Sequence, residues 1–333
     1  MKARVLSGVQ PSGQLHIGNY LGALKNWAEI QDRYDSIFCI VDLHAVTVYQ
    51  DPQQLAAKIR ETAALFIAAG IDPERSHIVV QSSIPAHAEL AWLLTCATPL
   101  GWLYRMTQFK AKAEAQETVS DGILQYPVLM AADILIYQAA IVPVGEDQMQ
   151  HLELTRDVAQ RFNSLYGETF VMPETKLPAV GARIMGLDDP TAKMSKSAAG
   201  SGHAVALLDP PERIRKTITR ATTDSNPAID FETMGAGVAN LLNIFQAFSE
   251  WPDDKMRAHF AGMRYGDLKK QVAEIVIEKL EPIQRRYREI TADPGYLDSV
   301  LKTGAEAVSP IANSTVELAK ARMGIYVPRY HKA

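Results

Sequence analysis

The sequence predicts an α/β fold, in which a doubly wound parallel sheet is followed by a C-terminal α-helical domain. In the first half, short apolar runs alternate with longer amphipathic ones, and beyond about residue 188 the patterns are mostly helical. Strands that alternate with helices are joined by right-handed crossovers, which produce a parallel sheet. The length of 333 residues is in keeping with two domains.

The strands expected in the first half are short and mostly apolar: Val5–Val9, Ser36–Val41, Ile78–Gln81 and Ile141–Gly145. The helices expected between them have helical periodicity: Gly18–Tyr34, Pro52–Gly70 with Gly70 as its C-cap, Ala86–Thr98, Gly122–Ala139 and Asp147–Tyr166. In the last of these, Leu152, Thr155, Ala159, Phe162 and Tyr166 recur at spacings of three and four, which places one face against the sheet. This order of elements is that of a Rossmann-type domain.

The second half begins with a segment rich in Asp, Lys, Ser and Gly, residues 188–202, which suits a mobile loop. The helices expected after it are Pro211–Arg220, Gly237–Trp251, Tyr265–Thr291 and Asp293–Gly324. We therefore expect a Rossmann-type domain over residues 1–187, a loop over 188–202 and a helical domain over 203–333.

The composition indicates the cellular compartment and the classes of partner to expect. No apolar run approaches a membrane span, and no signal region precedes the first strand. Cys39 and Cys96 lie in apolar segments without metal-ligand spacing, so we expect two buried thiols in a reducing compartment. The net charge of −4 argues against general nucleic-acid coating and leaves any RNA contact to local basic patches. We therefore expect a cytoplasmic protein with neither a membrane nor a DNA partner.

A glycine-containing turn joins the first strand to the first long helix, over Ser7–Asn19. In a parallel sheet, ligands bind beyond the carboxyl ends of the strands, where a helix N-terminus offers free N–H groups to phosphate. Gly18 allows close approach of a nucleotide, and His16 and Asn19 can donate hydrogen bonds to a phosphate chain. Alternatively, the glycines only permit a tight turn and His16 is an ordinary residue at a helix start.

A second candidate site lies in the loop, at Lys193-Met194-Ser195-Lys196-Ser197. Two lysines separated by two residues on a small, polar loop can converge on one polyanion and stabilise a departing pyrophosphate. Lysine is a mobile point charge, which suits a loop that closes and reopens. The alternative is a solvated surface loop.

Together, these two segments resemble the signatures of the class I aminoacyl-tRNA synthetases. His16-Ile17-Gly18-Asn19 is similar to the HIGH signature, and Lys193–Ser197 matches the KMSKS signature letter for letter. With Gly8–Gly13 in front, the first segment resembles the tryptophanyl branch. The resemblance implies that ATP is contacted by Gln10, Pro11, Ser12, Gly18 and Asn19, and by Lys193, Met194, Ser195, Lys196 and Ser197. The chain departs from the usual continuation of the loop, an acidic residue and Pro, with Ala198-Ala199.

Asp133 is the most informative residue between the signatures. It stands in an apolar helical run, where an unpaired carboxylate would be costly, and a carboxylate is a natural acceptor for an indole N–H. The resemblance assigns it that role. A phenol hydroxyl would satisfy it equally, so Asp133 alone does not exclude tyrosine, and the remaining alternative places it on a solvent-facing helix side.

Further residues are candidates on the same basis. The amino-acid pocket is expected to include Met130, Val142 and Val144 as apolar walls, Tyr126 and Gln148 near the ammonium group, and His44. The ATP site is expected to include Gly145, Glu146 and Asp147, of which Asp147 can also cap its helix, and Ile184 beside the adenine. Lys112 resembles a family lysine near the terminal phosphate, or is an ordinary surface charge. We count Lys193, Lys196, His16 and Lys112 as the catalytic candidates.

The resemblance implies ATP-dependent activation of L-tryptophan and its transfer to the 3′ end of tRNA(Trp). Magnesium is expected through the ATP phosphates, with no metal site of protein ligands. The helical domain is expected to bind the anticodon, with basic clusters near residues 213–220 and 285–288, and two chains are expected to form a homodimer. The alternatives are a tyrosyl-tRNA synthetase, a different adenylyltransferase of related fold, and a silent paralogue that binds RNA or tryptophan.

Overall fold

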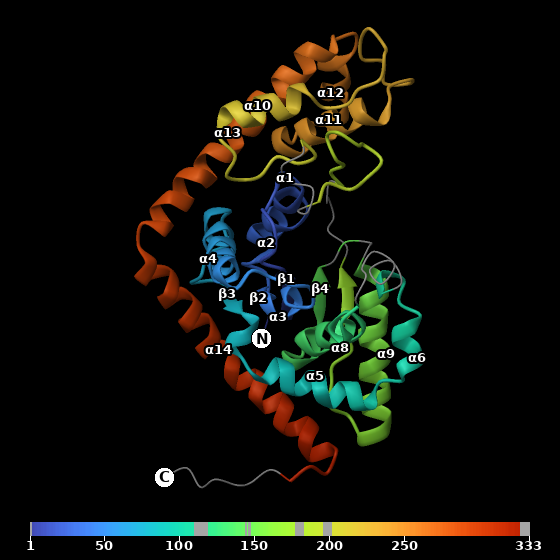
Figure 1. Cartoon of the computed structure of the whole chain (residues 1–333), viewed down its shortest axis with the longest axis vertical. Coiled ribbons are helices and arrows are strands. Elements are labelled where there is room, and N and C mark those ends of the chain that lie inside the picture. Colours follow the sequence, from blue (N-terminus) through green and yellow to red (C-terminus); the bar gives the residue numbers. More distant parts are fainter. Residues whose placement is uncertain are drawn as a thin grey trace.

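The computed structural model describes residues 2–109, 119–143, 145, 148–176, 183–195 and 202–326. Its five-stranded sheet is parallel throughout, in the order β3-β2-β1-β4-β5 (Figure 1). The strands are β1 Arg4–Val9, β2 Asp35–Ile40, β3 His77–Val80, β4 Ile141–Pro143 and β5 Glu174–Lys176. The four strands expected from the sequence are confirmed. The fifth was not predicted, because Glu174-Thr175-Lys176 contains no apolar run.

The helices of the first half connect these strands. They are α1 Ile17–Asn19, α2 Lys25–Ile30, α3 Asp42–Ala45, α4 Pro52–Ala68, α5 Ala86–Ala97, α6 Leu100–Tyr104, α8 Asp121–Ile136 and α9 Met149–Tyr166. The helix predicted over Gly18–Tyr34 is α1, the π-helical turn η1 Tyr20–Leu24 and α2 in succession. A 3₁₀ turn, η2 Gln81–Ser83, follows β3. Gly70, with φ of 105°, occupies the left-handed position after α4 as expected for its C-cap.

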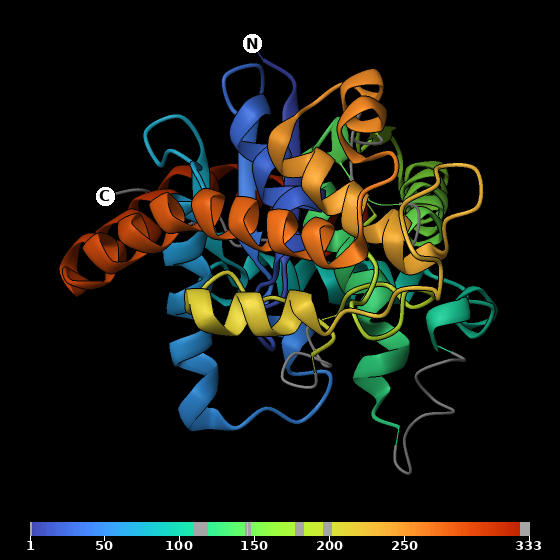
Figure 2. The same cartoon turned by 90° about the horizontal axis from the view of Figure 1, so that it is seen from above.

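Helices cover both faces of the sheet, and β2 is accordingly apolar and buried from Ile37 to Ile40. Phe38 and Ile40 pack in one hydrophobic cluster with α2 and α4, whereas Ile37 and Cys39 pack in a second cluster with α5 and α8. Alternate residues of a strand point to opposite faces, and this produces the two clusters. The result is the doubly wound parallel sheet predicted from the sequence, which lies behind the helices of the second half when the molecule is seen from above (Figure 2).

The second half comprises α10 Pro211–Thr219, α11 Ala236–Ser249, α12 Asp253–Phe260, α13 Tyr265–Thr291 and α14 Pro294–Arg322. Helices α10 to α12 gather at one end of the molecule, and α13 runs from there back past α4 (Figure 1). Helix α14 then lies along β3, where a Cβ at Gly304 would come 2.2 Å from the carbonyl oxygen of Ile78. Val308 and Ala312 of α14 belong to the same hydrophobic cluster as α5 and α8. The last helix therefore packs against the sheet domain.

The two cysteines differ in their surroundings. Cys39 is fully buried in β2, and burial raises the pKa of its thiol well above the usual value. Cys96 is exposed, so the expectation that both thiols are buried is wrong for this residue. Cys96 lies on the exposed face of α5. The residues around it in the sequence are mostly apolar, so the sequence did not show that this position faces solvent. Along the described residues, no helix combines the length and apolar character needed to cross a membrane.

Candidate active site

The strand order reverses between β1 and β4, which are neighbours in the middle of the sheet. The chain leaves β1 toward α1 and β2 on one side, and leaves β4 toward α9 and β5 on the other. Ligands of doubly wound sheets bind in the crevice outside the carboxyl ends of the strands at this switch point. Gln10, Pro11 and Ser12 follow β1 directly, and Gly145 and Gln148 follow β4. The structure therefore brings these five predicted residues to the switch point.

The turn after β1 shapes the start of α1. Gly13 has φ of 63°, a conformation that glycine adopts without strain, and His16 is 3% exposed at the N-cap position with an extended backbone. The backbone N–H of His16 donates to Oδ1 of Asn19 at 3.1 Å, which fixes the asparagine at the first helical turn. A Cβ at Gly18 would lie 3.0 Å from the His16 ring and 3.6 Å from Cβ of Ile184. The predicted first site and the segment before the lysine loop are therefore in contact.

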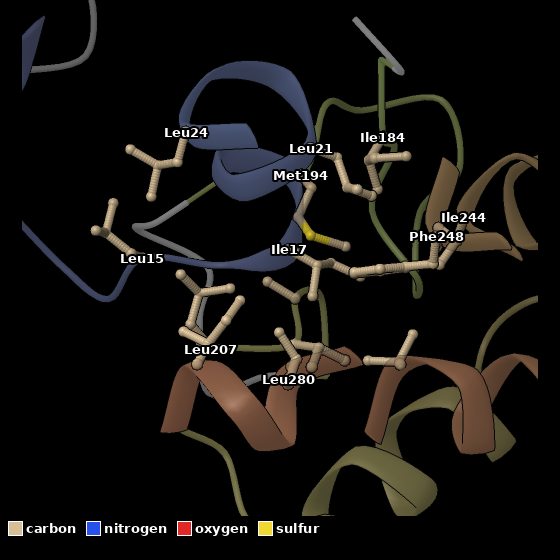
Figure 3. Close-up of a cluster of buried hydrophobic side chains, with 14 of the residues drawn as sticks. Leu15, Ile17, Leu21, Leu24, Ile184, Met194, Leu207, Ile244, Phe248 and Leu280 are labelled. Carbon is tan, nitrogen blue, oxygen red and sulfur yellow. The ribbon is translucent and has the colours of Figure 1, made fainter. Parts of the chain in front are cut away.

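Backbone hydrogen bonds hold the lysine loop to the segment before it, and hold the helix start to the segment after the loop. The N–H of Met194 donates to the carbonyl of Ile184 at 3.1 Å, and the N–H of Ile17 donates to the carbonyl of Val205 at 3.0 Å. Met194 and Ile184 are 3% and 2% exposed, and both side chains pack beside Ile17 and Leu21 (Figure 3). The side chain of Met194 therefore anchors the loop in the core, while Lys193 beside it is exposed. The two signature segments form one unit in space.

Asp133 lies in the interior, 4% exposed, within a cluster of polar side chains. Its Oδ2 accepts a hydrogen bond from Nε2 of His44 at 2.7 Å. Its Oδ1 accepts two, from Nε2 of Gln81 and Nδ1 of His87, both at 2.7 Å. Nε2 of His87 in turn accepts from the hydroxyl of Tyr137 at 2.7 Å. The alternative of a solvent-facing Asp133 is wrong, and the carboxylate is held by three donors from three different segments.

Burial alone would raise the pKa of Asp133, but the neighbouring imidazoles of His44 and His87 outweigh it and lower the pKa to about 2. The carboxylate therefore stays ionised at neutral pH and is a strong acceptor. Burial raises the pKa of Tyr137 well above its ordinary value, so that hydroxyl remains a donor. A polar acceptor with fixed orientation in an apolar helix is the arrangement that selects a substrate with one N–H or O–H.

Tyr126 marks the other side of the candidate pocket. It is 8% exposed, and its hydroxyl contacts Nε2 of His151 at 2.8 Å and donates to Oε1 of Gln108 at 3.0 Å. Burial raises the pKa of Tyr126 to about 12, so the phenol remains protonated at neutral pH. Its ring lies edge-on to that of His44, with centroids 6.3 Å apart. Tyr126 and Asp133 therefore flank His44, and the three predicted pocket residues meet.

The remaining predicted residues lie nearby or outside the described part. Val142 is buried in β4, Met130 is half-buried on α8, and Gln148 occupies the N-cap position of α9. Six predicted site residues fall outside the described residues: Lys112, Val144, Glu146, Asp147, Lys196 and Ser197.

Sequence reasoning missed five polar residues that the structure brings to the pocket: Gln81, His87, Gln108, Tyr137 and His151. His87 and His151 are fully buried, each in a helix whose inner face is otherwise mainly apolar. A lone histidine on an inward-facing helix position needs a hydrogen-bond partner, and this was the available signal. Its partner lies 46 residues away for His87, so the pairing itself was not visible in the sequence.

The chain is similar to known tRNA synthetases in sequence. A family model described as tRNA synthetases class I (W and Y) matches residues 1–281. The tryptophan–tRNA ligase of Wolinella succinogenes is 52% identical over 326 residues, 98% of this chain and 99% of that protein. That of Caldanaerobacter subterraneus subsp. tengcongensis is 53% identical over 324 residues, 97% of this chain and 98% of that protein.

Solved structures of tryptophanyl-tRNA synthetases are similar to this chain in fold. The tryptophanyl-tRNA synthetase of Mycoplasma pneumoniae aligns with a TM-score of 0.91 at 36% identity, covering 98% of this chain and 99% of that one. The enzyme of Campylobacter jejuni, complexed with ADP and tryptophan, aligns with a TM-score of 0.83 at 34% identity, covering 96% and 99%. The similarity extends over the sheet and the helical half alike.

Proposed function

Because the chain belongs to the class I tRNA synthetases for tryptophan and tyrosine, we propose that it activates L-tryptophan with ATP and transfers it to the 3′ end of tRNA(Trp). Relatives that are about half identical over nearly the whole chain are tryptophan–tRNA ligases. The geometric observation that carries the proposal is the packing of Met194, in the lysine loop, beside Ile17 of the helix start at the switch point of the sheet. These relatives favour tryptophan over the tyrosine alternative.

In the activation step, the carboxylate of tryptophan attacks the α-phosphorus of ATP, forming tryptophanyl-adenylate and releasing pyrophosphate. We assign the phosphate chain to the helix start, where Gly18 leaves room and His16 and Asn19 supply polar groups. Lys193 and Lys196 neutralise the charge that grows on pyrophosphate as it leaves. No protein nucleophile is required, because the reacting groups come from the two substrates and the protein positions them.

Specificity for tryptophan is assigned to the interior cluster. Asp133 accepts the indole N–H at Oδ2, which accepts from His44 within the described residues, whereas Oδ1 accepts from both Gln81 and His87. Met130 and Val142 line the ring, and Tyr126 and Gln148 bind the ammonium group. Phenylalanine has no N–H for this carboxylate, so one acceptor position at Oδ2 stays unpaired in the closed pocket, which disfavours that substrate.

The neutral donor set after β1, formed by Gln10, Ser12 and Asn19, suits phosphate oxygens better than a bare divalent cation. Within the described residues, no three His, Cys, Asp or Glu side chains cluster as a metal site. We therefore propose that Mg²⁺ is held by the ATP phosphates. When bound there, it neutralises charge on the phosphate chain.

The domain organisation of the chain fits the second step of the reaction, the transfer of tryptophan to tRNA. We propose that residues 1–187 bind ATP and tryptophan, that 188–202 form the closing loop, and that 203–333 bind the anticodon. Exposed cations at the C-terminal end of α10 and on α13 are available for RNA phosphates, including Arg220 and Arg288. Others are paired with carboxylates, such as Arg215 with Glu274 at 2.8 Å.

A homodimer in the cytoplasm is proposed as the working form. Its surface is assigned to α5 and α6, where Trp92, Leu100 and Tyr104 are 67%, 52% and 51% exposed. Apolar side chains exposed on neighbouring helices are typical of protein–protein contacts. Light scattering of the wild-type chain and of Trp92→Asp tests this, since the variant is expected to shift toward monomer.

The function is tested by ATP–pyrophosphate exchange with each of the twenty amino acids, followed by charging of tRNA(Trp). Exchange with tryptophan alone is the expected result. Exchange with tyrosine would keep the mechanism and overturn the pocket assignment. Absence of exchange with every amino acid, together with retained tRNA binding, would favour the silent paralogue.

A further inference from the structure

His203 lies at the base of the lysine loop, 6% exposed, between two acceptors. Its Nδ1 donates to Oδ1 of Asp188 at 2.6 Å. Its Nε2 donates to the backbone carbonyl of Lys193 at 3.2 Å. The ring therefore joins residue 188, which precedes the loop lysines, to the first of those lysines. His203 is not among the site residues predicted from the sequence.

Both partners of the ring are pure acceptors, which fixes its protonation. A carbonyl oxygen and an ionised carboxylate have no proton to give, so both hydrogen bonds exist only when His203 carries protons on both nitrogens. The charged groups that face the ring are the carboxylates of Asp188, in direct contact, and Asp189, whose pKa is lowered chiefly by its hydrogen bonds to Thr191 and also by His203.

The space for the ring exists because residue 186 is glycine. A Cβ at Gly186 would lie 2.2 Å from Cε1 and 2.6 Å from Nδ1 of His203, well inside contact distance. The backbone of His203 is held next to this glycine, because the Leu187 N–H donates to the carbonyl of His203 at 2.9 Å. Thr222 Oγ1 donates to the carbonyl of Asp188 at 2.7 Å and ties the base of the loop to the segment after α10. The ring thus sits in a fitted, backbone-lined site.

We propose that His203 is a positioning residue for the lysine loop, holding the Lys193 carbonyl so that the lysine ammonium reaches the departing pyrophosphate. The inference rests on the proposed function for the role of Lys193, and on geometry alone for the role of His203. Lysine acts as a point charge at the end of a flexible stem, so its reach depends on where its backbone is held. The Lys193 ammonium stabilises charge that develops in the transition state. Loss of its positioning is therefore expected to lower kcat more than it raises the KM for tryptophan.

Two substitutions separate the two hydrogen bonds. In His203→Gln, the side-chain amide nitrogen takes the place of Nε2 and keeps the donor to the Lys193 carbonyl. In His203→Asn, the amide nitrogen takes the place of Nδ1, keeps the contact with Asp188 and loses the one with Lys193. His259→Asn is the matched control, because that histidine is exposed on α12 and its ring contacts Gln271.

The first measurement is kcat and KM for tryptophan in ATP–pyrophosphate exchange. We expect kcat of His203→Asn to fall about tenfold or more, with KM changed less than about twofold. His203→Gln is expected to restore kcat, because its amide nitrogen keeps the hydrogen bond to the Lys193 carbonyl. Equal kcat for the Gln and Asn variants would overturn the proposal.

The second measurement needs no substrate. Hydrogen–deuterium exchange of residues 184–194 reports the amides of Gly186 and Met194, which donate to Ala192 at 2.8 Å and Ile184 at 3.1 Å. These amides are expected to exchange faster in His203→Asn than in His203→Gln or the control. Unchanged exchange in the Asn variant would refute the positioning role. A wild-type chain inactive with tryptophan would instead refute the proposed function, and the exchange contrast would still decide the role of His203.

Discussion

Replacing Asp133 with asparagine tests the interior cluster, because the substitution keeps the shape and removes the charge. Three hydrogen bonds of 2.7 Å end on this carboxylate. Hydrogen bonds to a charged group contribute about 1 kcal/mol more than neutral ones, so the loss is about 3 kcal/mol of unfolding free energy. The pKa gives a similar figure, since a fall from 3.8 to about 2 for this fully buried group corresponds to about 2 kcal/mol.

The pH dependence follows from the direction of that pKa. A carboxylate whose pKa is lowered by folding stabilises the protein above its unfolded pKa, and this contribution disappears as pH falls through the folded value. The difference between wild type and Asp133→Asn in urea unfolding is therefore expected to be full at pH 7 and to shrink between about pH 4 and pH 2. A difference that is zero at pH 7, or constant down to pH 2, would refute the reasoning.

The same variant tests substrate selection. Loss of a charged acceptor for the indole N–H is expected to lower kcat/KM for tryptophan about 10- to 100-fold, while the KM for ATP changes little. The benzothiophene analogue of tryptophan, which lacks the N–H, is the matched substrate. Wild type should prefer tryptophan to the analogue, and the variant should lose most of that preference. A variant that keeps the full preference would place the N–H acceptor elsewhere.

Three further outcomes are expected. Gly304→Ala forces a Cβ to 2.2 Å from the Ile78 carbonyl and should lose about 1–3 kcal/mol in urea unfolding, whereas Gly266→Ala, with nothing within 4 Å, should be neutral or stabilising. Lys193→Ala should lower kcat of pyrophosphate exchange by about 10²–10³, and a loss below about twofold would contradict its role. Arg288→Ala should weaken tRNA charging and reduce its salt dependence without affecting exchange; a parallel loss of exchange would indicate misfolding instead.

The fold was largely predictable because its determinants are local. Apolar runs of strand length and helices of period 3.6 are visible in the sequence, and α13 was predicted at its observed bounds, Tyr265–Thr291. Strand β5 was missed because its position comes from pairing with β4, not from its own composition. The π-helical turn Tyr20–Leu24 was missed for a similar reason, since its residues have the same helical pattern as their neighbours.

The site was predictable only in part. His16 and the lysine loop were found through their resemblance to known signatures, and Asp133 through the cost of a carboxylate in an apolar run. Of the partners of Asp133, His44 was predicted as a pocket residue, whereas Gln81 and His87 were missed, because they come from segments that meet Asp133 only in the folded protein. His203 was missed because its meaning depends on Gly186, whose missing side chain makes room for the ring.

The covering of β3 by α14 has a consequence for biosynthesis. β3 is an edge strand, and the helix residue that approaches its backbone, Gly304, lies far along the chain from Ile78. At about 5–20 residues per second, a ribosome needs on the order of 10–50 s to add the intervening chain. During that interval the nascent protein carries an uncovered strand edge, which can pair with another chain. A chain stalled or truncated before α14 should therefore be a substrate for chaperones and proteases.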